Sequence, residues 1–166
     1  MSRGHLPSTR KVNAPGQATS TSLISGPLRS DLFPLLIGYH TRRATNRILD
    51  LFHQQMDGRG IKPSEFAVLH IIGQNPGVTP GQLCTELDLL PPNLAKIVGR
   101  FIRRHLVDRK VSAIDKRIAT LRLTPAGEGV LREAEGVVVA LERQASSRLT
   151  DPQRAELVRL LRKIYE

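Results

Sequence analysis

The residues of this 166-residue chain best suited to chemistry are cations and amides arranged for contact with a polyanion. Polar side chains recur every three or four positions along "NLAKIVGRFIRR": Asn93, Lys96, Arg100 and Arg103. Apolar side chains fill the positions between them: Leu94, Ile97, Val98, Phe101 and Ile102. This spacing predicts a helix with one core face and one cationic face. Lys and Arg neutralise phosphates, and Asn and Arg also hydrogen-bond base edges, so the cationic face suits nucleic acid.

A second basic element follows directly, in "VDRKVSAIDKRIATLRLTPAG". Two short runs of strand-forming residues, "LVDRKV" and "ATLRL", flank the polar stretch "SAIDKRI", which predicts a β-hairpin. The tip of this hairpin carries Asp115, Lys116 and Arg117. A basic hairpin beside a basic helix extends the cationic surface.

The distribution of charge agrees with this interpretation. The formal net charge is +10, and residues 91–122 alone hold nine Lys and Arg against two Asp and Glu. A near-neutral scaffold with one basic block is typical of a nucleic-acid-binding protein, because phosphate neutralisation releases counterions. A basic solvated surface without a partner is the alternative that charge alone leaves open.

The elements that must position these residues form a helix-turn-helix. In "TPGQL", Thr79 is placed to cap a helix, Pro80 suits its first position, and Gln82 completes a capping box. Pro91 and Pro92 break the chain and start the cationic helix, which we expect to run to about His105. A helix-turn-helix followed by a hairpin is a winged helix. The predicted fold class is therefore mainly α with a small β-hairpin wing.

Longer helices are expected on both sides of the winged helix. The first runs from Asp31 to about Asp57-Gly58 with apolar groups on more than one face, which predicts packing against its own core and a second subunit. A short apolar helix starts near Pro63. After the hairpin, Thr124 and Pro125 start a long helix, and Thr150 starts the last one. The stripe expected to face the core in that long helix is Val130, Ala134, Val137, Val138 and Leu141.

The motifs "PGVTPGQL", "NLAKIVGRFIRRHLV" and "DKRIATLRLTPAG" together resemble the MarR family of winged-helix transcription regulators over about residues 32–165. The most specific element is Asp115-x-Arg117 followed by Leu123-Thr124-Pro125-x-Gly127. The resemblance implies a homodimer that binds double-stranded DNA at a pseudo-palindromic operator. Residues 1–28 are rich in Ser, Thr, Pro and Gly and carry only cations, which predicts a disordered basic tail, and the resemblance assigns 29–166 to a MarR-type domain. Within that domain, 62–124 form the winged helix, and 31–57 with 125–166 form the dimerisation helices.

The resemblance also implies roles for residues. Those placed to read or anchor on the major groove are Pro92, Asn93, Ala95, Lys96 and Arg100. Arg117 enters the minor groove from the wing, where Lys116 lies beside it, and Asp115 orients a neighbouring cation; a turn-forming aspartate is the alternative for Asp115. The chain departs from the family pattern at Gly99, usually acidic, and at His105, usually a glycine at a left-handed helix cap.

The opening of the first helix, "IGYHTRRATNRILDLF", resembles regulators of aromatic catabolism that answer to aromatic acids or acyl-CoA thioesters. An aromatic anion needs a cation at one end and apolar walls around its ring. The expected effector-binding residues are Tyr39, His40, Arg43, Phe66 and His70. For each of them a core or dimer-interface role is the alternative. The predicted function is a repressor released by a small aromatic anion, and the alternative is an effector-independent architectural DNA-binding protein.

Other function classes have little support in the sequence. It contains no phosphate-binding loop, no metal-ligand spacing and no nucleophile with an evident base, so neither an enzyme nor a metal or other cofactor is expected. Cys84 is expected in the core. The low aromatic content, 4%, disfavours RNA recognition by base stacking. We find no signal-peptide pattern and no apolar run of membrane-spanning length, which predicts a cytoplasmic protein, nucleoid-associated when DNA-bound and without a membrane partner.

Overall fold

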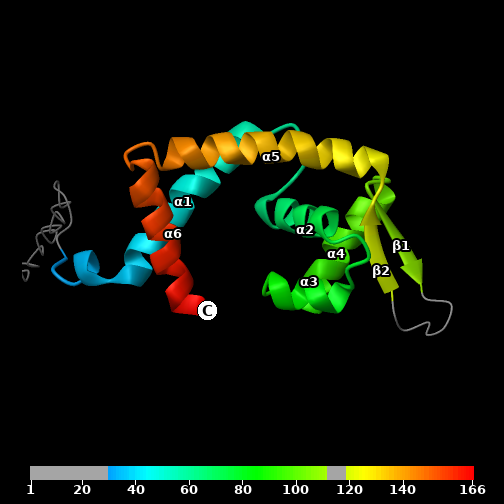
Figure 1. Ribbon diagram of the computed structural model, residues 1–166, viewed down its shortest axis with the longest axis horizontal. Coiled ribbons are helices and arrows are strands. Elements are labelled where there is room, and N and C mark those ends of the chain that lie inside the picture. Colours follow the sequence, from blue (N-terminus) through cyan, green and yellow to red (C-terminus); the bar gives the residue numbers. More distant parts are fainter. Residues whose placement is uncertain (1–29, 112–118) are drawn as a thin grey trace, which may run out of the picture. The chain divides into compact units, whose positions relative to one another are not determined.

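The computed structural model describes residues 30–111 and 119–166 (Figure 1). Residues 30–35 belong to a separate unit and form one turn of 3-10 helix, η1 (Phe33–Leu35), where the Phe33 amide donates to Ser30 Oγ at 3.2 Å. The second unit, Leu36–Glu166, carries the remaining elements: α1 (Ile37–Met56), α2 (Pro63–Gln74), α3 (Pro80–Glu86), α4 (Pro91–Arg103), β1 (Val107–Val111), β2 (Ala119–Leu123), α5 (Pro125–Ala145) and α6 (Asp151–Tyr165). The predicted fold class, mainly α with a small hairpin, is confirmed.

The first long helix begins later than expected. The sequence pattern predicts a start at Asp31, whereas α1 begins at Ile37 after the separate turn η1. The break falls at Leu36, whose extended backbone (φ −94°, ψ 118°) precedes the first turn of α1. Helix α4, the predicted cationic helix, likewise ends at Arg103, two residues before the expected end.

The helix starts follow the predicted caps. Thr79 Oγ1 accepts from the Gln82 amide, and Gln82 Oε1 accepts from the Thr79 amide at 2.9 Å, which completes a capping box at the start of α3. The same reciprocal arrangement joins Thr150 and Gln153 at the start of α6. Each box satisfies backbone donors that the first turn of a helix leaves unpaired.

The wing is an antiparallel pair, β1 and β2, in which Val107 faces Leu123 and Val111 faces Ala119. The segment before α3 adds an isolated antiparallel β-bridge between Val78 and Leu121, which the sequence does not predict. There the Leu121 amide donates to the Val78 carbonyl at 2.9 Å, and the Gly77 amide donates to the Leu121 carbonyl at 2.8 Å. These two hydrogen bonds connect strand β2 of the wing to the segment that leads into α3.

One hydrophobic core unites the helices of the second unit. In Figure 1, α5 extends from the hairpin to α6, and it packs against both α1 and α2. The buried side chains of α5 are Leu131, Ala134 and Leu141. Of the expected stripe, Ala134 and Leu141 are buried, whereas Val130, Val137 and Val138 are only partly buried against the core. Cys84 is partly buried against this core, in agreement with its expected position.

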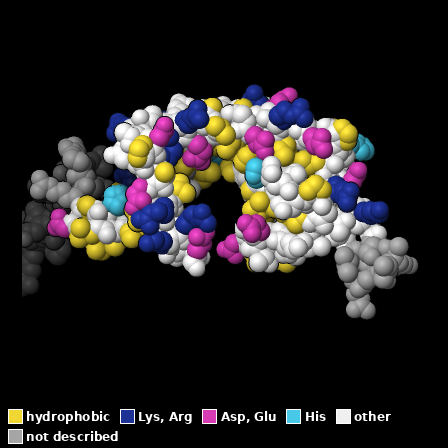
Figure 2. Space-filling view, in the orientation of Figure 1, with side chains coloured by type: hydrophobic (Ala, Val, Ile, Leu, Met, Phe, Trp, Pro, Cys, Tyr) yellow, Lys and Arg dark blue, Asp and Glu magenta, His cyan; other side chains and the backbone are white. Residues whose placement is uncertain are grey.

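The final helix, α6, has no buried residue. Its apolar side chains are exposed, namely Leu157, Val158, Leu160, Ile164 and Tyr165. Arg159 pairs with Glu156 through two hydrogen bonds of 2.7 and 2.6 Å, and these bonds hold the pKa of the Glu156 carboxyl below its ordinary value. Figure 2 shows Lys and Arg side chains gathered with acidic ones over α6. Its surface thus alternates between charged pairs and uncovered apolar groups.

Candidate nucleic-acid interface

The recognition helix α4 separates its two faces as its spacing predicts. Leu94, Ile97, Val98 and Phe101 are buried. Four residues expected at the major groove are exposed: Pro92, Asn93, Ala95 and Lys96. Ile102 departs from the expected core face and is exposed, because eight residues at 100° each carry it about 80° away from Leu94. Ala95 and Gly99 are small, so no long side chain projects from the outer surface of α4 at these two positions.

Arg100 lies differently from the other polar residues of α4. Its Nη1 atom is 2.6 Å from Oε1 of Glu65, a residue of α2 that is 1% exposed. The two groups form an ion pair without the alignment of a hydrogen bond, since Glu65 Oε1 has no hydrogen-bond partner. Glu65 Oε2 accepts from the Lys62 amide at 2.9 Å and thereby caps α2. The sequence signal for this pair was an acidic residue at the third position of an otherwise apolar helix.

The tip of the wing, with the expected contacts Asp115, Lys116 and Arg117, lies outside the described residues. In the described part of the hairpin, Arg109, Lys110 and Arg122 are exposed cations. Arg109 and Arg122 lie on opposite strands, and Arg122 directly faces Asp108 across the pair. Apart from Asp108, the charged side chains in the described part of the hairpin are therefore all cations.

The turn between α4 and the wing contains His105, at a position where the family pattern usually has a glycine. The backbone of His105 has φ of 54°, so a residue with a β-carbon stands in the left-handed region. The Leu106 amide donates to the Phe101 carbonyl at 2.9 Å, and the His105 amide donates to the Ile102 carbonyl at 3.0 Å. This is the Schellman arrangement that normally uses glycine. It turns the chain out of α4 and into β1.

The start of α5 is fitted closely to the same turn. Thr124 Oγ1 accepts from the Gly127 amide at 3.0 Å, which caps α5, and donates to the His105 carbonyl at 2.7 Å. A β-carbon on Gly127 would lie 2.0 Å from the Leu106 carbonyl oxygen. The Leu-Thr-Pro-x-Gly motif therefore fixes the end of the wing and the start of α5 against the end of the recognition helix.

The expected effector residues form two separate groups. On α1, Arg43 Nη1 donates to Tyr39 Oη at 2.9 Å, and the Tyr39 and His40 rings lie edge to face with 5.4 Å between their centroids. On α2, the Phe66 and His70 rings stack at 5.8 Å, and His70 Nδ1 lies 2.9 Å from Glu135 Oε1 of α5. Phe66 also approaches Phe52, which is thirteen residues along α1 from Tyr39, about 20 Å at the rise of an α-helix.

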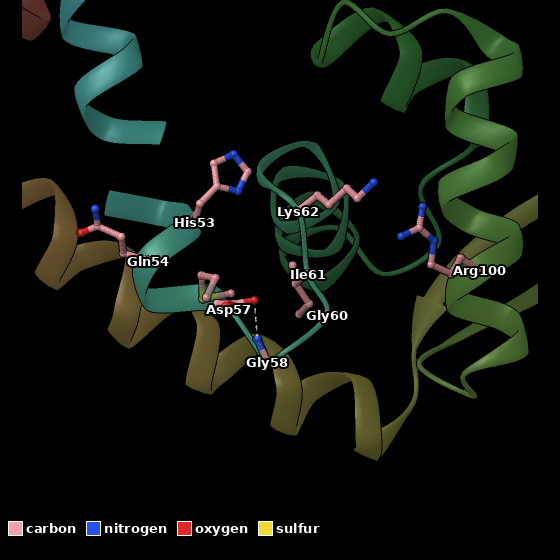
Figure 3. A pocket seen from close by; sticks show the side chains of 9 residues that line it. His53, Gln54, Asp57, Gly58, Gly60, Ile61, Lys62 and Arg100 are labelled. Carbon is pink, nitrogen blue, oxygen red and sulfur yellow. Dashed lines mark hydrogen bonds between the residues drawn. The ribbon is translucent and has the colours of Figure 1, made fainter. Parts of the chain in front are cut away.

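A pocket of about 670 Å³ opens near the end of α1, the start of α2 and α4. The side chains around it include His53, Met56, Asp57, Ile61, Lys62 and Arg100 (Figure 3). Of these residues only Arg100 is a site residue expected from the sequence, and there it is expected to contact DNA. Within the described residues, no three His, Cys, Asp or Glu side chains are grouped so as to hold a metal ion.

Comparison with known proteins agrees with this geometry. The model of the MarR family matches residues 59–118. A protein named as the transcriptional regulatory protein for the hcr operon of Thauera aromatica is 27% identical over 152 residues, 91% of this chain and 89% of that protein. The structure of the transcriptional repressor CouR bound to a 23-mer DNA duplex is 27% identical, with a TM-score of 0.80 over 85% of this chain and 100% of that one.

BpsR of Bordetella bronchiseptica, whose DNA binding is regulated by 6-hydroxynicotinic acid, shares the fold. It has a TM-score of 0.73 at 21% identity, over 78% of this chain and 98% of that one. Over residues 59–118 the chain is similar to the MarR family, and its fold is similar to that of the CouR repressor. None of the helices in residues 30–111 and 119–166 has the length and hydrophobicity that crossing a membrane requires.

Proposed function

We propose that the protein is a homodimeric repressor that binds a pseudo-palindromic DNA operator and releases it when a small aromatic anion binds. The observation that carries the DNA-binding part is the outer face of α4. Asn93, Ala95 and Lys96 are exposed there, next to a wing whose base carries further cations. Pro92, Arg100, Asp115, Lys116 and Arg117 complete the proposed contact set, with Arg117 in the minor groove. The CouR complex supports this proposal, because CouR is similar to this chain and its structure contains a bound DNA duplex.

Dimerisation is proposed from the surface of α6 and the start of α1. The exposed apolar groups of α6 would remain in water in a single chain, as would those of Leu36 and Ile37 at the start of α1. Exposed apolar patches of this kind mark protein interfaces. We therefore assign residues 31–57 and 125–166 to dimerisation and residues 62–124 to the winged helix, within a domain at 29–166.

The effector is proposed from the aromatic and cationic side chains of α1 and α2. Phe66 and His70 present a stacked ring pair, while Tyr39, His40 and Arg43 combine rings with a guanidinium. Such groups suit a ligand with an aromatic body and one negative end. In the fold relative BpsR the regulating molecule is an aromatic acid, and this guides the choice of probes.

The proposal is tested by titrating the DNA upstream of the protein's own gene with and without 6-hydroxynicotinate, hydroxycinnamates and their CoA thioesters. A ligand shifts the equilibrium only through a difference in affinity for the free and DNA-bound arrangements. We expect one of these compounds to weaken operator binding at least about tenfold. Operator binding that none of the panel changes favours the effector-independent architectural protein.

A further inference from the structure

Glu65 is the one charged side chain that is buried in the part of the chain that the structure describes. It is 1% exposed and shares the buried face of α2 with Val68, Leu69 and Ile72. Burying a carboxylate costs free energy that an apolar side chain at the same position would not cost. The groups that compensate this charge therefore show what the carboxylate does.

Both carboxylate oxygens of Glu65 are engaged. Oε2 accepts a hydrogen bond from the Lys62 amide at 2.9 Å, and Oε1 lies 2.6 Å from Nη1 of Arg100. Within residues 30–111 and 119–166, Arg100 is the one cation at ion-pair distance from Glu65. Figure 3 shows Arg100 projecting from α4 on the side where Lys62 extends from the start of α2. The carboxylate thus connects the backbone of α2 to a side chain of the recognition helix.

A second arginine makes a parallel connection one turn further along. Arg104, the residue that caps the end of α4, donates from Nη1 to the Gly60 carbonyl at 2.9 Å. Two successive turns of α4 are therefore joined to residues 60–65. The apolar side chains of α4 also hold it against the core, but burial of apolar surface is not directional. The polar connections are directional, so they resist rotation of α4 about its own axis.

We propose that Glu65 is a positioning residue for DNA recognition. It holds Arg100 and thereby sets the rotation at which α4 presents Asn93 and Lys96 to the bases. Glu65 is too deeply buried to touch DNA, whereas Arg100 is 38% exposed and remains in the proposed contact set. This inference deepens the proposed function and rests on it.

The first test is the substitution Glu65→Gln, which keeps the size of the side chain and an oxygen that can accept from the Lys62 amide. Removing an acidic charge should by itself strengthen attraction to a polyanion. A positioning role predicts the opposite for specific binding. Fluorescence anisotropy compares the full-length protein and this variant on the duplex upstream of its own gene and on a scrambled duplex of equal length. We expect a loss of about fivefold or more on the upstream duplex and no loss on the scrambled one.

A double-mutant cycle then tests whether Glu65 acts through Arg100. Arg100→Met leaves the buried carboxylate without its counter-charge, and adding Glu65→Gln removes that uncompensated charge. We therefore expect Glu65→Gln to cause no further loss of affinity for the upstream duplex in the Arg100→Met background. Replacement of both partners of a buried ion pair is often neutral for stability, so we expect the double variant to fold. Its comparison with Arg100→Met decides the matter if Glu65→Gln alone does not fold.

Glu133→Gln is the matched control, because it makes the same charge change at an exposed position on α5. It should leave the affinity for both duplexes within about twofold of the unmodified protein. Circular dichroism and urea denaturation establish that each variant is folded at the temperature of the titrations.

Three results would overturn the positioning role. They are unchanged or tighter binding of the upstream duplex by folded Glu65→Gln, equal losses on the two duplexes, and the same loss from Glu65→Gln with and without Arg100. Each of these results would leave the proposed function intact if the unmodified protein still prefers the upstream duplex. Equal affinity of the unmodified protein for both duplexes would overturn the proposed function and, with it, this inference.

Discussion

The hydroxyl of Thr124 lies 2.7 Å from the carbonyl oxygen of His105 and joins the start of α5 to the end of the recognition helix. The same oxygen caps α5 by accepting from Gly127. One side chain therefore satisfies backbone groups of two elements, nineteen residues apart. The orientation of α5 relative to α4 depends on this joint, and three stability predictions follow from its geometry.

Thr124→Val keeps the shape of the side chain but removes both hydrogen bonds. Loss of a helix cap and of a second hydrogen bond should lower the free energy of unfolding by about 2–3 kcal/mol. Urea denaturation at one protein concentration measures the change. Thr120→Val is the matched control, because the Thr120 hydroxyl reaches Lys110 only at 3.4 Å, and its effect should be below about 0.5 kcal/mol. Equal effects of the two variants would contradict the role given to Thr124.

Gly127→Ala should destabilise the protein because its β-carbon would meet the Leu106 carbonyl oxygen at 2.0 Å. Overpacking of this kind costs about 1–3 kcal/mol. Gly129 and Gly136 lie on the same helix with open space at the β-carbon position, so their alanine variants should gain up to about 1 kcal/mol from helix propensity. Thermal unfolding of the three variants tests the contrast, and a gain in Gly127→Ala would refute the close approach.

His105→Gly should stabilise the protein. A left-handed conformation costs a residue with a β-carbon about 1–2 kcal/mol, and the extra freedom of glycine in the unfolded chain offsets part of this gain. The net increase expected is about 0.5–1 kcal/mol, measured by urea denaturation. Arg103→Gly, in the last turn of α4, should instead lose about 1 kcal/mol. A loss in both variants would show that the cap does not limit stability.

Local patterns were sufficient to predict most of this fold. Helix starts at Thr79, Thr124 and Thr150 follow from short-range capping chemistry, and the two faces of α4 follow from its period. The left-handed cap at His105 was also visible, because the resemblance placed a glycine there. These features depend on neighbours within about one helical turn.

Features that depend on distant segments were not predicted. One is the β-bridge between Val78 and Leu121, and another is the ion pair between Glu65 and Arg100. Both join residues far apart in the sequence, and sequence periodicity does not indicate such pairs. Arg100 has the spacing of a DNA-facing residue, yet a buried carboxylate on another helix draws its side chain inward. The expected effector residues fall into two groups for the same reason. Tyr39, His40 and Arg43 lie near the start of α1, whereas Phe66 of α2 lies beside Phe52, thirteen residues further along α1.

Variants of the proposed DNA contacts should distinguish residues that supply electrostatic affinity from residues that recognise the base sequence. Arg117→Ala removes a proposed minor-groove cation and should weaken operator binding and lower the dependence of binding on salt by about one counterion. Asn93→Ala should instead change sequence preference, by about 1–3 kcal/mol for a lost base contact. Fluorescence anisotropy over a series of salt concentrations and operator variants measures both. Arg132→Gln, an exposed cation of α5, is the control. An unchanged affinity in Arg117→Ala would remove the wing from the interface.

We infer that this chain is a sequence-specific DNA-binding regulator, and a competition titration on the DNA upstream of its own gene measures that specificity. We predict saturable binding of one dimer to a pseudo-palindromic site, tighter by about 10³ or more than binding to a scrambled duplex of the same length and salt concentration. Equal affinity for the two duplexes would contradict the claim.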